Sequence, residues 1–514
     1  MTNIVLRKFQ HKFPDICKLA NDSPDEEHFV SSLKAYFSIK ISETTNNQII
    51  ESCKLLLTML DNESAYIEEL SKGEKIYIET FSLLWSFLNG EEKSTKTDLF
   101  EDLFHLFLHA EGMEVNKPYT EVKLQRHMKR WVSGLDREIR QKRISNKERI
   151  IRLLVKKIDR KLMLTSRYQF EEGQSHEEKI KKVEEWWNDF RFHLSMAIKS
   201  PGELNTFLGE SLSTGTLKLL NRAKRKKIPF FITPYYISLL NTDQAGFDDN
   251  VIRTYVVYSE SLIETYGNIK AWEREDMVVP GEPNAAGWLL PDGHNIHRRY
   301  PEVSIMIPDT RGRSCGGLCA SCQRMYDFQS ERLNFDLEEL KPKESWDRKL
   351  HKLMDYFESD SQIRDILITG GDALMSRNRA LDKILDAVYK MALRKREANK
   401  QRVDGEKYYE IQRVRLGTRL LAYLPMRIDS ELITILKEFK RKGSEAGIKQ
   451  FVIQTHFQTP LEVTVEARRA IEEIISAGWV ISNQLVFTAA ASRRGHTAKL
   501  RQTLNSLGVV TYYT

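Results

Sequence analysis

The sequence predicts an α/β protein in which parallel strand–helix units follow an all-α N-terminal region. From about residue 303, short β-branched apolar runs alternate with helical patterns six times in roughly 210 residues. Residues 1 to about 170 instead repeat apolar residues at spacings of three and four, and strand-like alternation is scarce. Because 514 residues exceed one hydrophobic core, we expect several domains. The expected domains are a helical domain of unknown role (1–170), a helical and loop lead-in (171–295) and the strand–helix units (296–514).

The N-terminal helical patterns are clearest in IIESCKLLLTML (49–60) and DLFEDLFHLFLHAEGM (98–113). A polar linker, EEGQSHEE (171–178), precedes a second helical stretch that ends in ITPYYISLL (232–240). Residues 241–298 contain closely spaced proline and glycine residues, which break helices and strands, so this segment is expected to be rich in loops.

Six segments have the composition of strands, and helical patterns such as 381–393 and 465–478 lie between them. In a parallel barrel, functional groups gather at the carboxyl ends of the strands. Polar residues occupy these ends or lie just beyond them, except that Asn483 and Gln484 fall within the fifth strand, and we expect all of them to form one site. The expected strands are 303–309, 365–371, 412–418, 449–457, 480–487 and 508–514. The polar residues are Cys315, Gly370, Gly371, Asp372, Thr418, Arg419, Thr455, His456, Asn483 and Gln484.

Charge and cysteine usage restrict the class of protein. Residues 123–161 contain 15 Lys and Arg against 4 Asp and Glu, within a chain of net charge +7. This helical segment could bind nucleic acid or an acidic partner, but a solvated helix face is the commoner meaning of such a run. The 5 cysteines do not form a disulfide framework and indicate a reducing compartment. Neither an export signal nor an apolar run long enough to span a bilayer is visible, so a cytoplasmic protein is expected.

Three cysteines, Cys315, Cys319 and Cys322, lie within eight residues at Cys-x3-Cys-x2-Cys spacing. Four-thiolate sites are coordinatively full, whereas three thiolates on a four-iron cluster leave one iron open to a small molecule. Two alternatives remain at this level: a zinc site completed by His294 or His297, or an ordinary loop of reduced thiols. The other two cysteines lie far away in the sequence and are expected to be buried apolar residues.

The segment Gly370-Gly371-Asp372 ends an apolar strand. Glycines at this point let a ligand approach the backbone closely, and exposed N–H groups beside a carboxylate suit an amino-acid headgroup. The alternative is a plain turn from strand to helix in which Asp372 is the cap.

From about residue 185 to 514, the chain resembles the lysine 2,3-aminomutase family of radical S-adenosylmethionine enzymes. Residues 1–180 carry no such resemblance and are an addition to the family's short forms. The resemblance implies an incomplete (βα)6 barrel. The matching segments are WNDFRFHL (187–194), ITPYY (232–236), HRRYP (297–301), the cysteine loop, LITGGD (367–372), RLGTR (415–419), LPMRI (424–428), THF (455–457) with Pro460, and NQ (483–484).

By this resemblance, Cys315, Cys319 and Cys322 would hold a [4Fe–4S] cluster. S-adenosylmethionine would chelate the open iron and be cleaved to methionine and a 5′-deoxyadenosyl radical, which takes hydrogen from the substrate. The resemblance implies that Gly370, Gly371 and Asp372 contact the methionine part of S-adenosylmethionine. Three further contacts with this cofactor are expected from strand-end position: Thr418, His456 and Gln484.

The family also uses pyridoxal 5′-phosphate. The resemblance implies that Arg299 holds its phosphate and that Arg324 holds the substrate carboxylate, although either could be an exposed ion-pairing arginine. Val303 stands where a second phosphate-binding arginine is expected. Arg493 stands where lysine-specific enzymes carry an aspartate. The sequence given ends in TYYT, before the glycine-rich segment with the aldimine lysine, so no such lysine is assigned.

The function expected from these observations is an aminomutase-like isomerase that acts on a small amino acid or amine, with an electron donor such as flavodoxin or ferredoxin. One alternative keeps the radical chemistry without pyridoxal phosphate. Another is a non-enzymatic zinc or nucleic-acid-binding protein that uses the cysteine loop structurally. A homo-oligomer is possible, and neither nucleic acid nor a membrane is the expected partner.

Overall fold

The computed structural model divides the chain into two compact units, Met1–Thr120 and Glu121–Thr514, and each is described by itself. The predicted boundary at residue 170 therefore falls inside the second unit. None of the helices in the described part of the chain is both long and apolar enough to cross a membrane. The structure describes all residues except 1, 70–73, 91–96, 115–119, 161–166, 227, 229, 243–245, 258–259, 266–294, 318, 320–343, 489 and 513–514.

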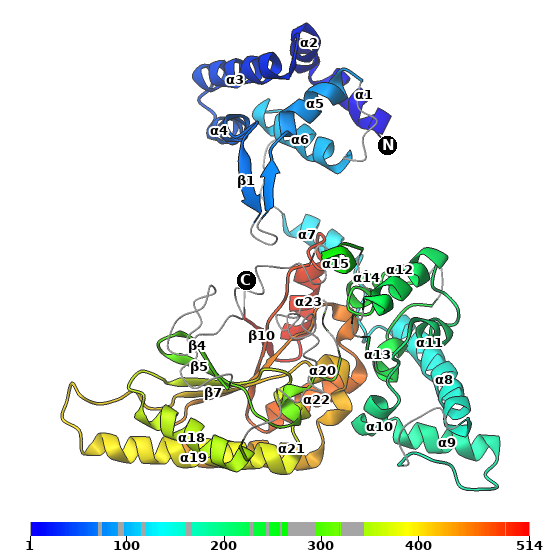
Figure 1. Cartoon of the computed structure of the whole chain (residues 1–514), viewed down its shortest axis with the longest axis vertical. Coiled ribbons are helices and arrows are strands. Elements are labelled where there is room, and N and C mark those ends of the chain that lie inside the picture. The colour runs from blue at the N-terminus through cyan, green and yellow to red at the C-terminus, as the bar shows by residue number, and fades with distance from the viewer. Residues whose placement is uncertain are drawn as a thin grey trace. The chain divides into compact units, whose positions relative to one another are not determined.

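The first unit consists mainly of helices (Figure 1). Its core is rich in phenylalanine. The ring of Phe9 contacts Phe87, Phe104 and Phe107 at centroid distances of 6.3, 5.3 and 5.9 Å. An antiparallel hairpin, β1–β2, interrupts the helices, so the predicted all-α region contains a small sheet. Its elements are α1 (Thr2–Lys12), α2 (Pro14–Asp22), α3 (Glu26–Glu43), α4 (Asn47–Asp61), β1 (Tyr66–Glu69), β2 (Glu74–Tyr77), α5 (Thr80–Leu88) and α6 (Thr97–Ala110).

The second unit begins with helices that precede its sheet. The basic helix α8 buries Ile150, Ile151, Leu154 and Ile158 in the core of this unit. The lead-in helices are α7 (Glu121–Met128), α8 (Arg137–Asp159), α9 (His176–Trp186), α10 (Phe190–Ser195), α11 (Pro201–Phe207), α12 (Thr214–Arg225), α13 (Pro234–Ser238), α14 (Asn250–Arg253) and α15 (Glu260–Thr265).

Among the described residues of this unit, seven strands form one sheet in the order β10-β9-β8-β7-β6-β5-β4. Neighbouring strands from β5 to β10 are parallel, which confirms the predicted α/β class, and β4 is antiparallel to β5. The sheet ends at β4 and β10, and the incomplete barrel stays a prediction. The strands are β4 (Ile296–Tyr300), β5 (Val303–Met306), β6 (Asp365–Ile368), β7 (Arg413–Gly417), β8 (Gln450–Thr455), β9 (Val480–Asn483) and β10 (Val509–Thr511).

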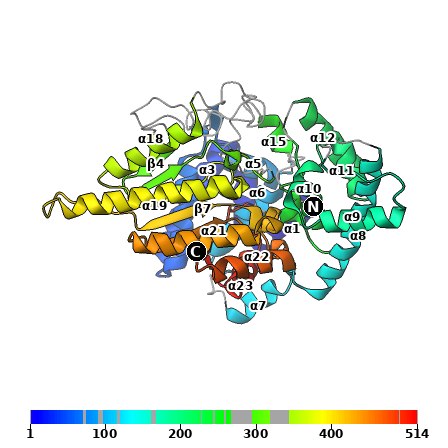
Figure 2. The same cartoon turned by 90° about the horizontal axis from the view of Figure 1, so that it is seen from below.

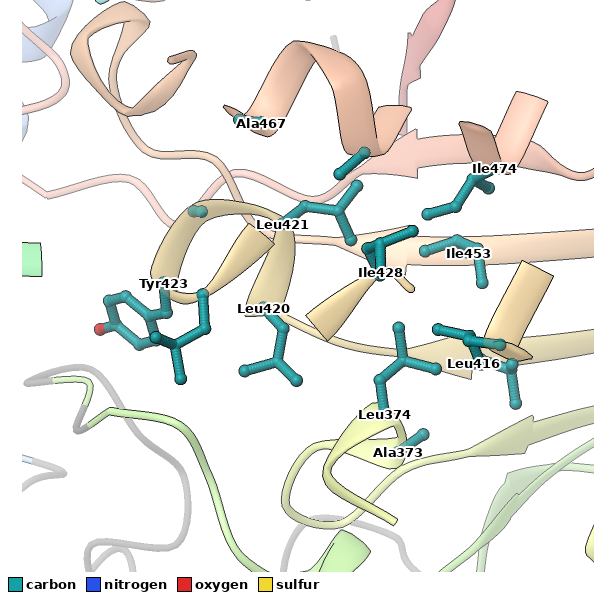
Figure 3. Packing of buried hydrophobic residues seen from close by; sticks show 14 of the residues in the cluster. Ala373, Leu374, Leu416, Leu420, Leu421, Tyr423, Ile428, Ile453, Ala467 and Ile474 are labelled. Atoms are coloured by element: carbon teal, nitrogen blue, oxygen red, sulfur yellow. The ribbon is translucent and has the colours of Figure 1, made fainter. Parts of the chain in front are cut away.

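Helices α18, α19 and α21 lie together along one face of this sheet (Figures 1 and 2). Alternate strand residues such as Ile366, Leu416 and Ile453 belong to the buried apolar core, part of which is shown in Figure 3. The remaining elements are η1 (Arg311–Arg313), α18 (Trp346–Ser359), η2 (Ala373–Met375), α19 (Asn378–Lys400), α20 (Leu420–Tyr423), η3 (Pro425–Arg427), α21 (Ser430–Glu445), η4 (Pro460–Glu462), α22 (Val465–Ser476) and α23 (His496–Asn505).

Side-chain caps start the helices that return along the sheet. Ser345 caps α18, Asp429 caps α21 and Thr464 caps α22, and in each case the side-chain oxygen accepts a hydrogen bond from a backbone N–H of the first turn. Gly478, with a φ of +79°, follows the end of α22. These short-range signals fix where each helix starts or stops, and so place the strand ends at one edge.

Candidate active site at the carboxyl ends of the parallel strands

The polar residues predicted at the strand ends follow parallel strands that pair in register. Cys315 lies beyond β5, Asp372 beyond β6, Thr418 beyond β7, His456 beyond β8 and Gln484 beyond β9. Since β5, β6, β7, β8 and β9 are consecutive in the sheet, these residues lie along one edge of it.

Gly316 and Gly317, which follow the first cysteine, lie directly against α20. A Cβ atom on Gly316 would come within 2.5 Å of Cδ2 of Leu420, and one on Gly317 within 2.9 Å of Cε2 of Tyr423. Cys315 and Cys319 are half-buried and form no disulfide. Two thiols outside any disulfide, on a segment packed this closely, fit a thiolate-ligated cluster by the chemistry of their donors.

The third predicted ligand, Cys322, lies outside the described residues, as does Arg324. Within the described part of the chain, no group of three or more His, Cys, Asp or Glu side chains could hold a metal ion. His297, one candidate for a zinc site, pairs with Ile305 across β4 and β5, and His294 lies outside the described residues.

Asp372 is buried, and its carboxylate is used within the protein. Oδ1 accepts hydrogen bonds from the Thr418 hydroxyl at 2.7 Å and from the backbone N–H of Leu374 at 3.1 Å. Oδ2 accepts from the backbone N–H of Arg419 at 2.7 Å. Burial raises the pKa of Asp372 to about 6, against the opposing effect of these hydrogen bonds. The Asp372 side chain therefore caps η2, as expected for a turn from strand to helix. Its hydrogen bonds also connect the end of β6 to the end of β7.

The glycines before Asp372 bring strands β5 and β6 close together at their ends. Gly370 has a φ of +114°, and a Cβ atom there would lie 2.6 Å from Cγ2 of Ile307. The backbone N–H of Asp372 donates to the carbonyls of Gly312 at 2.9 Å and Ser314 at 3.1 Å, immediately before the first cysteine. The LITGGD segment is therefore hydrogen-bonded to the residues that directly precede Cys315.

A row of hydrogen bonds crosses the sheet on the face opposite the apolar core. Nε of Arg415 donates to Oδ1 of Asp365 at 2.9 Å, and its Nη1 donates to Oε1 of Gln454 at 2.9 Å. Nε2 of Gln454 in turn donates to Oε1 of Gln484 at 2.7 Å. Residues of β6, β7 and β8 thus hold the amide of Gln484, one of the predicted S-adenosylmethionine contacts.

His456 is predominantly neutral at pH 7. Burial, with a contribution from the positive charge of Arg419, lowers the pKa of His456 to about 4. A neutral imidazole offers one donor and one acceptor, so it can hydrogen-bond a ligand without adding charge. Asn483 fixes the turn that carries it, because its side-chain oxygen accepts from the N–H of Phe457 at 2.6 Å and its amide donates to the Phe457 carbonyl at 3.1 Å.

Two arginines, Arg299 and Arg493, were also singled out from the sequence. Arg299 lies within β4, but its side chain is outside the described residues. Arg493 forms an ion pair with Asp248, with Nη1 2.5 Å from Oδ2, and its guanidinium lies 4.5 Å from the ring centroid of Trp131. The charge of Arg493 is therefore already paired within the chain.

Comparisons with known proteins found one family model and several relatives. A family model described as a domain of unknown function (DUF8427) matches residues 2–112, nearly all of the first unit. An uncharacterized KamA family protein of Methanocaldococcus jannaschii is 27% identical over 397 residues, which cover 76% of this chain and 53% of the relative. An L-lysine 2,3-aminomutase of Methanococcus maripaludis is 27% identical over 328 residues, 64% of each chain.

The chain is similar to the lysine 2,3-aminomutases. A glutamate 2,3-aminomutase of Clostridioides difficile is also 27% identical, over 336 residues that cover 64% of this chain and 65% of the relative. The chain spans about half to two thirds of the length of these curated relatives. Their names support an aminomutase family, whose members are isomerases.

Several residues that build the site were not singled out from the sequence. Arg415, Glu462 and Tyr236 form buried polar contacts there. Tyr236 lies in the ITPYY segment and Arg415 in RLGTR, so the resemblance included them without a role. Their partners could not be deduced, because Tyr236 and Glu462 are 226 positions apart in the chain.

Proposed function

We propose that this chain is a radical S-adenosylmethionine enzyme of the aminomutase type, in which Cys315, Cys319 and Cys322 hold a [4Fe–4S] cluster. The observation that carries the proposal is the cysteine loop, bonded to the LITGGD segment at the carboxyl edge of a parallel sheet. When bound, such a cluster passes one electron to S-adenosylmethionine, whose sulfur–carbon bond then breaks to give methionine and a 5′-deoxyadenosyl radical.

In this proposal the protein supplies position and hydrogen bonds. The backbone of Gly370 and Gly371 allows close approach of the methionine part of S-adenosylmethionine. Asp372 keeps this backbone in place, since its carboxylate is bonded to Thr418 and Arg419 inside the protein. Thr418 therefore acts through Asp372 and orders the site.

Two polar side chains from the next strands would complete the contacts with S-adenosylmethionine. Gln484 is held by Gln454, and His456 is predominantly neutral at pH 7. Both can donate or accept a hydrogen bond in that state. Neither adds charge near a positively charged sulfonium compound, which supports the assignment.

The substrate proposed is a small amino acid or related amine, because a relative named for lysine and one named for glutamate are both 27% identical to the chain. Arg324 would hold the substrate carboxylate and Arg299 the phosphate of pyridoxal 5′-phosphate; the first residue and the second side chain lie outside the described residues. Val303, where the resemblance implies a second phosphate-binding arginine, favours keeping a second candidate in which the radical enzyme works without pyridoxal phosphate.

Anaerobic reconstitution with iron and sulfide tests the proposal. The protein should bind about four iron atoms and, with dithionite or reduced flavodoxin, convert S-adenosylmethionine into methionine and 5′-deoxyadenosine. Stoichiometric zinc with no cleavage would overturn it in favour of a structural metal site. A pyridoxal absorption band that is lost on borohydride treatment would decide between the two radical candidates.

Variants connect this activity to particular residues. Cys319→Ala should abolish cleavage, because two thiolates do not hold a reactive cluster, whereas Cys17→Ala in the first unit is the matched control and should leave cleavage intact. Arg324→Ala should keep uncoupled cleavage and weaken substrate binding. Normal deoxyadenosine production by Cys319→Ala would contradict the ligand assignment.

A further inference from the structure

Arg419 contacts both Asp372, in the turn after β6, and Cys319, one of the proposed cluster ligands. Its backbone N–H donates to Oδ2 of Asp372 at 2.7 Å. Its side chain reaches the cysteine loop, where Nη1 lies 3.3 Å from Sγ of Cys319. This sulfur is not part of a disulfide and stands for the thiolate that would ligate iron. One residue thus connects the turn after β6 to a proposed cluster ligand.

The guanidinium of Arg419 is held on several sides. Nη2 donates to Oε1 of Glu462 at 2.9 Å, and the side chains are 9% and 0% exposed respectively. The guanidinium carbon lies 4.0 Å from the ring centroid of Tyr255 and 4.3 Å from that of Tyr423. Cation–π contacts and a buried ion pair together keep the charge in place next to Cys319.

Glu462 is in turn fixed by two donors. The hydroxyl of Tyr236 donates to Oε1 at 2.6 Å, and the backbone N–H of Gln458 donates to Oε2 at 2.6 Å. Tyr423 completes the arrangement, because its hydroxyl lies 3.5 Å from Sγ of Cys319. In Figure 3, this hydroxyl points away from the aliphatic cluster. Two donors therefore reach the same sulfur from α20 and the residue before it.

Burying a charged pair costs free energy, and a protein is often at least as stable when apolar residues of similar volume replace the pair. A buried pair beside a reactive sulfur is thus better explained by an effect on that sulfur. Hydrogen bonds to cluster sulfurs and nearby positive charge make the reduced, more negative state easier to reach, so they raise the reduction potential.

We propose that Arg419 is a positioning residue that holds Cys319 for cluster binding and raises the reduction potential of the cluster, with Glu462 and Tyr423 in support. This inference rests on the proposed function. It goes beyond that function in naming the side chain that sets the potential of the cluster. Arginine suits this role better than lysine, since its planar fork reaches Cys319 and Glu462 at once.

The experiment is a redox titration of the reconstituted full-length protein, followed by the electron paramagnetic resonance signal of the reduced cluster. Arg419→Met should lower the midpoint potential, so that the ratio of reduced to oxidised cluster at the wild-type midpoint falls at least tenfold, or about 59 mV for one electron. Arg419→Lys should give a smaller shift. Arg364→Met is the control, because that arginine pairs with Glu302 in an exposed position at the other end of β6, and its midpoint should equal that of wild type.

Tyr423→Phe still tests the inference if Arg419→Met does not fold or does not bind iron. It removes only the hydroxyl near Cys319 and should lower the midpoint in the same direction. Equal midpoints in wild type, Arg419→Lys and Tyr423→Phe at equal iron content would overturn the inference while the proposed function stands. A wild-type protein that binds no iron–sulfur cluster would instead overturn the proposed function itself.

Discussion

The hydroxyl of Thr418 donates a 2.7 Å hydrogen bond to Oδ1 of Asp372, although the two residues are 46 positions apart. This bond joins the end of β7 to the turn after β6, and both side chains are nearly inaccessible to solvent. A carboxylate in such a place depends on its donors, because burial alone disfavours its charge.

Thr418→Val should therefore destabilise the protein and disturb the LITGGD segment. Valine has nearly the same shape but no donor, and loss of a hydrogen bond to a charged group costs about 1.5–3 kcal/mol. Thr418→Ser keeps the hydroxyl and is the matched control. Urea unfolding of the two variants measures the difference. An equal free energy of unfolding for both would show that Asp372 does not need this donor.

Gly370→Ala should lower the free energy of unfolding more than Gly405→Ala does. At Gly370, φ is +114° and the added Cβ would meet Cγ2 of Ile307 at 2.6 Å. Gly405 has a φ of +95° with no atom within 4 Å of a Cβ atom, so Gly405→Ala incurs only the backbone strain of roughly 1–3 kcal/mol. The greater loss of stability in Gly370→Ala, measured by urea unfolding, isolates the contact with Ile307. Equal losses would mean that β5 and β6 can separate at no cost.

Arg415→Met should destabilise the protein strongly, because it leaves the buried carboxylate of Asp365 without its 2.9 Å partner. Removing one member of a buried pair costs about 3–5 kcal/mol, and we expect the lower end, since Arg413 remains 3.2 Å from the same carboxylate. The double variant Asp365→Asn with Arg415→Met should be more stable than Arg415→Met alone, because it no longer buries an unpaired carboxylate. Arg413→Met, whose side chain is 38% exposed, is the control and should cost under about 1 kcal/mol. Additive losses in the double variant would exclude coupling between the two groups.

His496 should make the protein sensitive to mild acid. Burial lowers the pKa of His496 to about 4, and its neutral ring donates from Nδ1 to the carbonyl of Ala491 and accepts at Nε2 from Thr459. The unfolded chain binds the proton below about pH 6.5 and the folded chain only near pH 4, so stability is lost as pH falls between these values. The expected loss from this residue is about 2 kcal/mol at pH 5.

The variant His496→Gln should lose less stability than wild type when urea unfolding is repeated at pH 7 and pH 5. His193 and His456, whose pKa values burial also lowers to about 4, keep their share of the acid sensitivity in that variant. His351→Gln, at an exposed position of α18, is the control. An unchanged pH dependence in His496→Gln would show that the ring is not buried in the neutral form.

The parallel strands and the residues at their ends could be predicted because both are local signals. β-branched apolar runs separated by helical patterns predicted strands at 303–309, 365–371 and 412–418, and the structure places β5, β6 and β7 within these ranges. The hairpin β1–β2 was not predicted. Its strands are four residues each, and short segments flanked by helices give little periodic signal.

Strand periodicity and helix caps act over a few residues, so they indicate where each strand lies along the chain and which polar residues follow it. The use made of those side chains depends on tertiary packing. Asp372 turns inward to Thr418, and the guanidinium of Arg419 lies between Cys319 and Glu462. The direction of a side chain at a strand end depends on packing against distant segments, and no local pattern records those partners.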